Sequence, residues 1–274
     1  MKLFFALILV SLSLFSCAPN NVTVDDSLGK YFKEAGADGC FALLDNTTGE
    51  FTVYNLARYR DSAFLPASTF DVVNALIGLQ TGVISSDSMV ISWDGIKRPF
   101  PEWNKNPTMY EAFRASAVPY FQEVARRIGK DTMQRWLDSL SYGTKRLKTR
   151  VDTFWLDHSL KISPDEQLGL VKRLYFNQLP FFKVNQETVK RAMIFEQNTA
   201  YTLAYKTGWG AWDPAHQKHI SWMVGWIEEN KQPRFFVLNL QSKDTKFDMP
   251  AMQMRILKSI LQQLGFMKGS NKPA

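Results

Sequence analysis

A serine and an acidic residue stand three positions apart at the start of an apolar run. Ser68 is followed by Asp71, and the apolar spacing after it predicts a helix over residues 69–81 that ends at Gly82. Positions i and i+3 lie on one face of a helix, so both groups would face the same place. A serine hydroxyl that attacks a carbonyl must lose its proton to a base within hydrogen-bond reach. The pair therefore indicates acyl transfer through a serine nucleophile.

Further segments carry side chains suited to the same chemistry. Ser116 lies in a stretch with helical periodicity over residues 109–128, Tyr142 lies in a loop after a second helix, and Lys206 ends a β-like run. In order and separation these segments resemble the motifs of the class D (oxacillinase-type) serine β-lactamases, from about residue 39 to residue 265. The motifs are Pro-Ala-Ser-Thr-Phe at 66–70, Ser-Ala-Val at 116–118, Tyr-Gly-Thr at 142–144, Phe-Trp-Leu at 154–156 and Lys-Thr-Gly at 206–208.

The resemblance implies a role for each motif residue. Ser68 would be the nucleophile, and its N–H group and that of Trp209 would form the oxyanion hole. Ser116 would relay a proton towards the lactam nitrogen. Lys206 would hold the substrate carboxylate, assisted by the hydroxyl of Thr207. The other residues that the resemblance places at the substrate are Val118, Trp155 and Gly208.

Asp71 departs from the family pattern. The resemblance implies a lysine at this position, which carbon dioxide converts to a carbamate that serves as the base and is steadied by a tryptophan. Trp155 is present, but Asp71 cannot be carbamylated, so no cofactor is expected. Three interpretations follow: Asp71 acts as a shortened base through water, it permits acylation and cripples deacylation, or it pairs with Lys206 and shuts the site. The second interpretation is preferred to the first.

A second departure concerns the substrate carboxylate. The family has an arginine near the start of the last helix, and that position falls on or near Gln253. Arg255 lies two residues away, which on a helix points roughly to the other face. Glutamine does not reproduce a bidentate arginine clamp. Weak substrate binding is therefore expected, unless local geometry repositions Arg255.

Strand-like segments come from both ends of the chain, and helical segments come from its middle. This order predicts an α+β (α-β-α) fold, in which an antiparallel sheet of N- and C-terminal strands packs with helices and carries an inserted helical lobe. The active site is expected between the sheet edge and that lobe. The expected strands are 38–45, 50–55, 199–206, 219–228 and 234–241, and the expected helices are 69–81, 109–128, 131–140, 164–176 and 249–264.

The first residues form an apolar targeting segment. Residues 1–16 resemble a bacterial lipoprotein signal with cleavage before Cys17, which would then carry lipid, and an ordinary secretory signal is the alternative. A tether over 17–28, a catalytic domain over 29–267 and a loose tail over 268–274 are expected to follow. The protein is then expected on the periplasmic side of the cell envelope, lipid-anchored or secreted. Cys40, one of only two cysteines, sits in a buried-strand pattern and is expected to be an inert core thiol.

The charge pattern and the histidines of the chain argue against nucleic-acid and metal binding. The chain has 274 residues and a net charge of +7 but no basic stripe with interleaved aromatics, so nucleic acid is not an expected partner. His216 and His219 have a metal-ligand spacing, but no cysteine or carboxylate cluster joins them, so no metal is expected. The resemblance implies a β-lactamase that β-lactams acylate at Ser68 and that hydrolyses them, with turnover impaired by Asp71. The alternative is a non-hydrolytic penicillin-binding or sensor protein with a long-lived acyl-enzyme. Peptidoglycan-like peptides are a second candidate ligand class.

Overall fold

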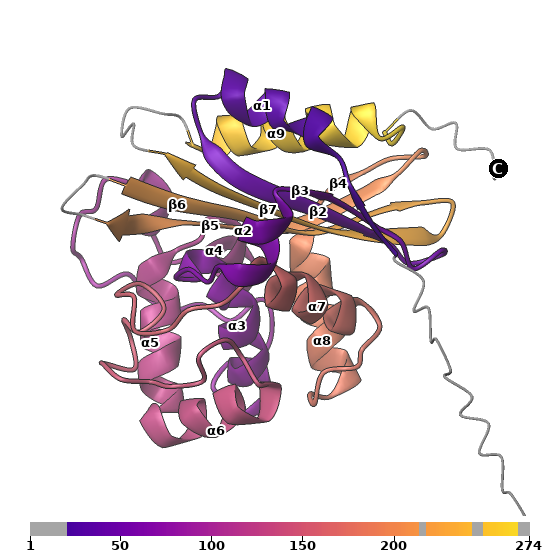
Figure 1. Ribbon diagram of the computed structural model, residues 1–274. Coiled ribbons are helices and arrows are strands. Elements are labelled where there is room, and N and C mark those ends of the chain that lie inside the picture. Colours follow the sequence, from indigo (N-terminus) through magenta and orange to yellow (C-terminus); the bar gives the residue numbers. More distant parts are fainter. Residues whose placement is uncertain (1–20, 214–217, 243–248, 268–274) are drawn as a thin grey trace, which may run out of the picture.

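A seven-stranded sheet forms the centre of the structure, a computed structural model that describes residues 21–213, 218–242 and 249–267 (Figure 1). The strand order is β1-β3-β2-β7-β6-β5-β4, so N- and C-terminal strands meet where β2 pairs with β7. Among the described strands, only β1 and β3 pair in parallel. The sheet predicted from both ends of the chain is confirmed. The strands are β1 (Val22–Val24), β2 (Asp38–Asp45), β3 (Phe51–Tyr54), β4 (Ile194–Gln197), β5 (Thr202–Asp213), β6 (Lys218–Glu229) and β7 (Gln232–Ser242).

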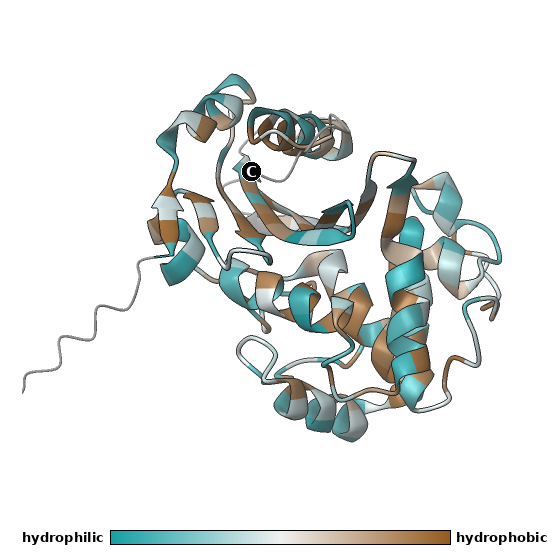
Figure 2. Ribbon diagram, turned by 90° about the vertical axis from the view of Figure 1, so that its right-hand side faces the viewer, coloured by the Kyte–Doolittle hydropathy of each residue, from teal (hydrophilic) through white to brown (hydrophobic). Residues whose placement is uncertain are grey.

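Helices cover both faces of this sheet. The short helix α1 (Gly29–Glu34) and the closing helix α9 (Met249–Gln263) lie on one face, and the other helices lie on the opposite face (Figures 1 and 2). Successive strand residues point to opposite faces, so Phe41 of β2 enters the core under α9 and Ala42 enters the core of the helical lobe. The predicted α+β fold is confirmed. The lobe contains α2 (Leu56–Asp61), α3 (Asp71–Gln80), α4 (Met109–Arg114), α5 (Val118–Ile128), α6 (Lys130–Leu140), α7 (Pro164–Tyr175) and α8 (Lys183–Met193).

The single helix predicted over residues 109–128 is wrong at its centre. α4 and α5 are separate, and Ser116 between them has a left-handed backbone with a φ of 48°. Pro119 stands in the first turn of α5. Proline is favoured there because it has no N–H group to leave unpaired, and it disfavours a helix that continues through it. Ser116 therefore lies in a turn rather than on a helix face.

The helix after Ser68 begins as a 3-10 turn. This turn, η2 (Ala67–Phe70), leads directly into α3, and Gly82 with a φ of 74° follows the end of the helix as predicted. Ser163 and Glu166 form a reciprocal cap at the start of α7, which confirms the helix start predicted there. The helices predicted over 131–140 and 249–264 are also confirmed. The prediction omitted α1, α2, β1 and β4, which are short, and also α8, which has 11 residues.

Two boundaries differ from the prediction. The segment expected to be a tether over 17–28 joins the sheet from Val22, because β1 pairs with β3 and Leu28 is fully buried. The strand expected to end at 206 continues as β5 to Asp213, so Lys206 lies in the strand interior. Cys17 and residues 268–274 lie outside the described residues. Within the described ranges, no helix combines the length and apolar character needed to cross a membrane.

Candidate active site

The turn that carries Ser68 is held by the chain around it. Ala67 has a φ of 48°, in the left-handed region that few non-glycine residues occupy. Its N–H group donates to the carbonyl oxygen of Trp155 at 3.1 Å. Thr69 Oγ1 accepts a hydrogen bond from Gln167 Nε2 at 2.6 Å. Ser68 is 5% exposed, so these contacts position a hydroxyl at the boundary between the core and solvent.

β5 lies against this turn, with no room for a side chain at Gly208. A Cβ atom there would lie 2.8 Å from the carbonyl oxygen of Pro66 and 2.9 Å from the backbone nitrogen of Thr69. Both neighbours are backbone atoms, so they cannot rotate away as a side-chain tip can. Gly208 therefore allows the close approach of the strand to η2, with Thr207 and Trp209 on either side of it.

Gly208→Ala is expected to lower the free energy of unfolding by about 1–3 kcal/mol, the usual cost of overpacking. The strand would have to move away from η2, which would also displace Ser68. Urea unfolding measures the change. Gly169→Ala is the control, because a Cβ atom at this position in α7 meets nothing within 4 Å and alanine favours helix. Equal stability of Gly208→Ala and the unchanged protein would contradict the close approach.

A cleft of about 350 Å³ opens above Ser68. Asp71, Lys206 and Trp155 do not line it, because their side chains are buried. The sequence-predicted site residues that line it together are Ser68, Ser116, Val118, Thr207, Gly208 and Trp209. The prediction missed other residues of its wall, chiefly Phe100, Trp103, Arg114, Phe195, Tyr205 and Met254. Most of these are apolar or aromatic and belong to no motif, so the sequence offered no signal for them.

Lys206 and Asp71 form a buried ion pair beneath the cleft. Lys206 Nζ lies 3.2 Å from Asp71 Oδ2, and both side chains are 1% exposed. Lys206 Nζ also donates to Ser116 Oγ at 2.5 Å and to the carbonyl oxygen of Thr207 at 3.0 Å. Lys206, expected to hold a substrate carboxylate, thus already has a carboxylate of the protein beside it. The third interpretation of Asp71 expects it to pair with Lys206 and to shut the site. The ion pair is present, but the cleft above Ser68 remains open.

Burial acts against both charges of this pair. It raises the pKa of Asp71 to about 6, although the positive charge of Lys206 works in the opposite direction. It lowers the pKa of Lys206, although the Asp71 carboxylate opposes this shift. For each group the loss of hydration outweighs the attraction of its partner. Asp71 can therefore gain or lose a proton near neutral pH, as a general base must.

The raised pKa of Asp71 predicts that the protein loses stability as the pH rises from about 4 to about 6. In this range the folded protein holds a proton that the unfolded chain has released, so removing that proton disfavours folding. The shift from 3.8 to about 6 corresponds to about 3 kcal/mol. Urea unfolding of both proteins across this range measures the effect. The unchanged protein should lose about 3 kcal/mol of unfolding free energy relative to Asp71→Asn as the pH rises. A difference independent of pH would contradict the raised pKa.

Comparison with known proteins places the chain in a family. The penicillin binding protein transpeptidase domain matches residues 39–262. The chain is 33% identical to β-lactamase OXA-11 of Pseudomonas aeruginosa over 98% of this chain and 100% of that protein. The chain belongs to the class D β-lactamase family. Its relatives also include the probable β-lactamase YbxI of Bacillus subtilis, with 40% identity over 83% of this chain and 81% of that protein.

Solved structures of related proteins share the fold. A class D β-lactamase YbXI from Nostoc has a TM-score of 0.83 and 35% identity, covering 89% of this chain and 100% of that chain. The C-terminal domain of the Bacillus licheniformis BlaR penicillin receptor also has a TM-score of 0.83, with 32% identity, and covers 89% of this chain and 96% of that chain. The same fold thus appears in a protein named as a β-lactamase and in one named as a penicillin receptor.

Trp155 has a buried hydrogen-bond donor without an acceptor. Its ring is fully buried and stacks on Phe70, with 5.4 Å between ring centroids. Its Nε1 has no hydrogen-bond partner among the described residues, and such a donor costs about 1–3 kcal/mol. The carbamate that the class D resemblance assigns to this tryptophan requires an amine at position 71. A carboxylate cannot react with carbon dioxide in this way, so Asp71 does not fit the modification.

The two candidates for a carboxylate-binding residue on α9 lie outside the cleft. Gln253 is 2% exposed and Arg255 is exposed. Their different exposure confirms that they point to different sides of the helix. α9 contributes Pro250 and Met254 to the cleft wall instead. In this class D protein, neither Gln253 nor Arg255 is placed to clamp a substrate anion.

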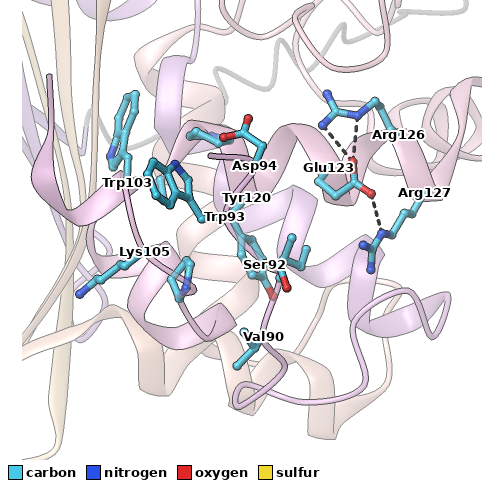
Figure 3. A pocket seen from close by; sticks show the side chains of 14 residues that line it. Val90, Ser92, Trp93, Asp94, Trp103, Lys105, Tyr120, Glu123, Arg126 and Arg127 are labelled. Atoms are coloured by element: carbon cyan, nitrogen blue, oxygen red, sulfur yellow. Dashed lines mark hydrogen bonds and ion pairs between the residues drawn. The ribbon is translucent and has the colours of Figure 1, made fainter. Parts of the chain in front are cut away.

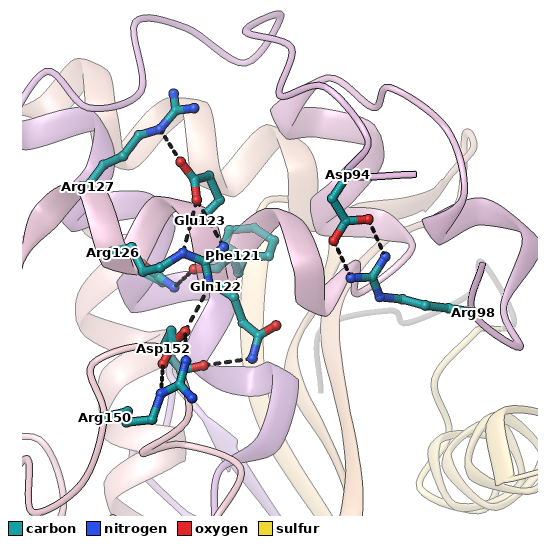
Figure 4. Close-up of polar contacts among 10 residues, drawn as sticks. Asp94, Arg98, Phe121, Gln122, Glu123, Arg126, Arg127, Arg150 and Asp152 are labelled. Carbon is teal, nitrogen blue, oxygen red and sulfur yellow. Dashed lines mark hydrogen bonds and ion pairs between the residues drawn. The ribbon is translucent and has the colours of Figure 1, made fainter. Parts of the chain in front are cut away.

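A second cavity of about 290 Å³ lies between the loop 90–107 and α5 (Figure 3). Trp103 lines both this cavity and the cleft above Ser68. The principal charges of this second cavity neutralise one another, because Glu123 accepts hydrogen bonds from Arg126 at 3.0 Å and from Arg127 at 2.8 Å (Figure 4). Arg126 also reaches Asp152 at 2.8 Å (Figure 4). This cavity therefore presents paired charges and is not the candidate catalytic site.

The cysteine and histidine candidates among the described residues lie outside the cleft above Ser68. Cys40 is buried in β2, and burial raises the pKa of its thiol to about 12, so the expected core thiol is confirmed. His219 lies in β6 and packs against Trp209, with 5.6 Å between ring centroids, and His216 lies outside the described residues. Within the described ranges, no three His, Cys, Asp or Glu side chains are grouped to hold a metal ion.

Proposed function

We propose that this protein is a serine β-lactamase that forms an ester at Ser68 and hydrolyses it slowly. The supporting observation is the cleft in which Ser68 lies together with Ser116 and the backbone of residues 207–209. Ser68 Oγ adds to the lactam carbonyl carbon, the ring C–N bond breaks, and the ring nitrogen takes a proton. Water then cleaves the ester, which releases the opened acid and restores the hydroxyl.

The proton for the ring nitrogen is proposed to come from Ser116. Ser116 Oγ lies 2.5 Å from Lys206 Nζ, so Lys206 can replace the proton that Ser116 gives away. The proton that leaves the Ser68 hydroxyl then restores Lys206, so the step consumes no net proton. The N–H groups of Ser68 and Trp209 are proposed to bind the developing oxyanion. Gly208 supports this assignment, because it brings the backbone of β5 against the turn that carries Ser68. The substrate is proposed to contact Val118 and Thr207 as it lies along β5.

We infer that Asp71 stands where class D β-lactamases carry a carbamylated lysine. Its position three residues after Ser68 and the unpaired Nε1 of Trp155 support this inference. The Asp71 carboxylate lies beside Lys206, so it is poorly placed to activate water at the ester. A general base typically contributes about 10²–10⁴-fold to a rate, so hydrolysis of the ester is the slow step.

The second candidate function is a penicillin receptor, which the likeness to the BlaR penicillin receptor domain favours. Nitrocefin, a chromogenic β-lactam, separates the two. We expect a burst of one opened molecule per protein, followed by slow continued hydrolysis. A burst with no further hydrolysis would assign the receptor function, and no burst at all would overturn acylation.

We also propose that lipid on Cys17 anchors the protein on the periplasmic side of the cell envelope. The support is the apolar run that ends in Leu-Phe-Ser-Cys at 14–17. Labelled palmitate should enter the unchanged protein and not Cys17→Ser, and equal labelling would contradict the proposal. Peptidoglycan-like peptides are proposed to enter the same cleft, where they would slow acylation by penicillin.

A further inference from the structure

The cleft above Ser68 has a one-sided charge. Among the described residues that line it, Arg114 is the one cation, and none is an acid. Lys206 is also near the cleft, since its Nζ donates a hydrogen bond to Ser116 Oγ. Its charge is buried, however, and Nζ lies 3.2 Å from Asp71 Oδ2. An anionic ligand that enters the cleft therefore meets one cation that no carboxylate among the described residues neutralises.

The Arg114 guanidinium is held in a fixed orientation. Arg114 is the last residue of α4, two positions before Ser116. Its Nη1 donates to the carbonyl oxygen of Ile194 at 2.6 Å. Its guanidinium carbon lies 3.8 Å from the ring centroid of Phe195, so the planar group stacks on the ring. A group held in this way loses little conformational entropy when it binds a ligand.

Arg114 also keeps donors for a ligand. A guanidinium has five N–H donors, and among the described residues only Ile194 accepts one from Arg114. The remaining donors include pairs that match the two oxygens of a carboxylate. Gln253 and Arg255 of α9 do not line the cleft, so neither of them competes with Arg114 for an anionic ligand.

We infer that Arg114 binds the carboxylate of the substrate and sets the preference of the cleft for anionic β-lactams. This inference rests on the proposed function, because it assigns a recognition residue to the same cleft. Arg114 takes part in recognition and does not touch the reacting atoms.

The test compares benzylpenicillin, which carries a carboxylate, with its methyl ester, which does not. The second-order rate of acylation of each is measured by intact-protein mass spectrometry in the unchanged protein, Arg114→Gln and Arg114→Lys. Arg114→Gln is expected to slow acylation by the acid about 10–100-fold, the usual effect of losing hydrogen bonds to a charged group. Its rate with the ester should change less than about twofold. Arg114→Lys should lie between, because a lysine keeps the charge but not the paired donors.

An equal loss with acid and ester would overturn the inference and leave Arg114 a structural link between α4 and Ile194. An unchanged rate with the acid would also overturn it. If neither compound acylates the unchanged protein, the proposed function fails, and equilibrium binding then tests Arg114 separately. Quenching of Trp103 and Trp209, which line the cleft, reports that binding. A preference for the acid that disappears in Arg114→Gln supports the inference, and no such preference overturns it.

Discussion

Asp71→Lys is expected to raise steady-state hydrolysis of nitrocefin by about 10²–10⁴-fold in buffer that contains bicarbonate. The substitution removes the carboxylate beside Lys206 and adds a longer side chain that ends in an amine. Carbon dioxide can add to this amine, and the resulting carbamate would be the base that the ester hydrolysis lacks. The buried Nε1 of Trp155, which has no partner among the described residues, would then have an acceptor.

Two comparisons separate this effect from simple removal of a charge. Asp71→Asn also frees Lys206 from its carboxylate but cannot form a carbamate, so its turnover should stay low. Removal of bicarbonate should lower the rate of Asp71→Lys and leave the other proteins unchanged. No gain in Asp71→Lys would contradict the assignment of Asp71 as the limiting residue. The low rate of hydrolysis would then come from weak substrate recognition, because Gln253 stands at the expected arginine position and does not line the cleft.

Lys206→Met is expected to lower the free energy of unfolding by about 3–5 kcal/mol at pH 8, the usual cost of breaking a buried ion pair. The substitution leaves Asp71 charged and 1% exposed with no cation at 3.2 Å. Loss of the Lys206 charge, which lowers the pKa of Asp71, raises that pKa further, so the carboxyl group is protonated at pH 5 and the loss of stability should shrink there. Urea unfolding at both pH values measures the effect.

The matched control is the double variant Asp71→Asn with Lys206→Met. It removes both charges, so much of the lost stability should return, because no unpaired charge stays buried. The two single variants complete a double-mutant cycle, which isolates the energy of the pair. Additive effects of the single substitutions would show that Asp71 and Lys206 do not interact.

The sequence permitted prediction of the features that depend on neighbouring residues. Ser68 could be placed at the start of a helix because an apolar run follows it and Gly82 ends that run. Gly208 belongs to a short motif, and the structure gives its physical reason, which is contact between β5 and the backbone of η2. The order of strands and helices was sufficient to predict the mixed fold.

Features that depend on distant contacts were not predicted in the same way. Asp71 and Lys206 come from different elements, and local pattern could not choose between the three interpretations of Asp71. Arg114 was missed because the predicted continuous helix over 109–128 hid the break at Ser116. Pro119 was the available signal for that break. Once α4 ends at Arg114, its side chain can line the cleft beside Ser116.

Intact-protein mass spectrometry after incubation with excess benzylpenicillin tests the role of Ser68 most directly. We predict that the unchanged protein gains the mass of one penicillin molecule and loses it only slowly after the free drug is removed, because ester hydrolysis is slow. Ser68→Ala should gain no mass. An unchanged protein that gains no mass and opens no penicillin, or a Ser68→Ala variant that gains the same mass, would contradict acylation at this serine.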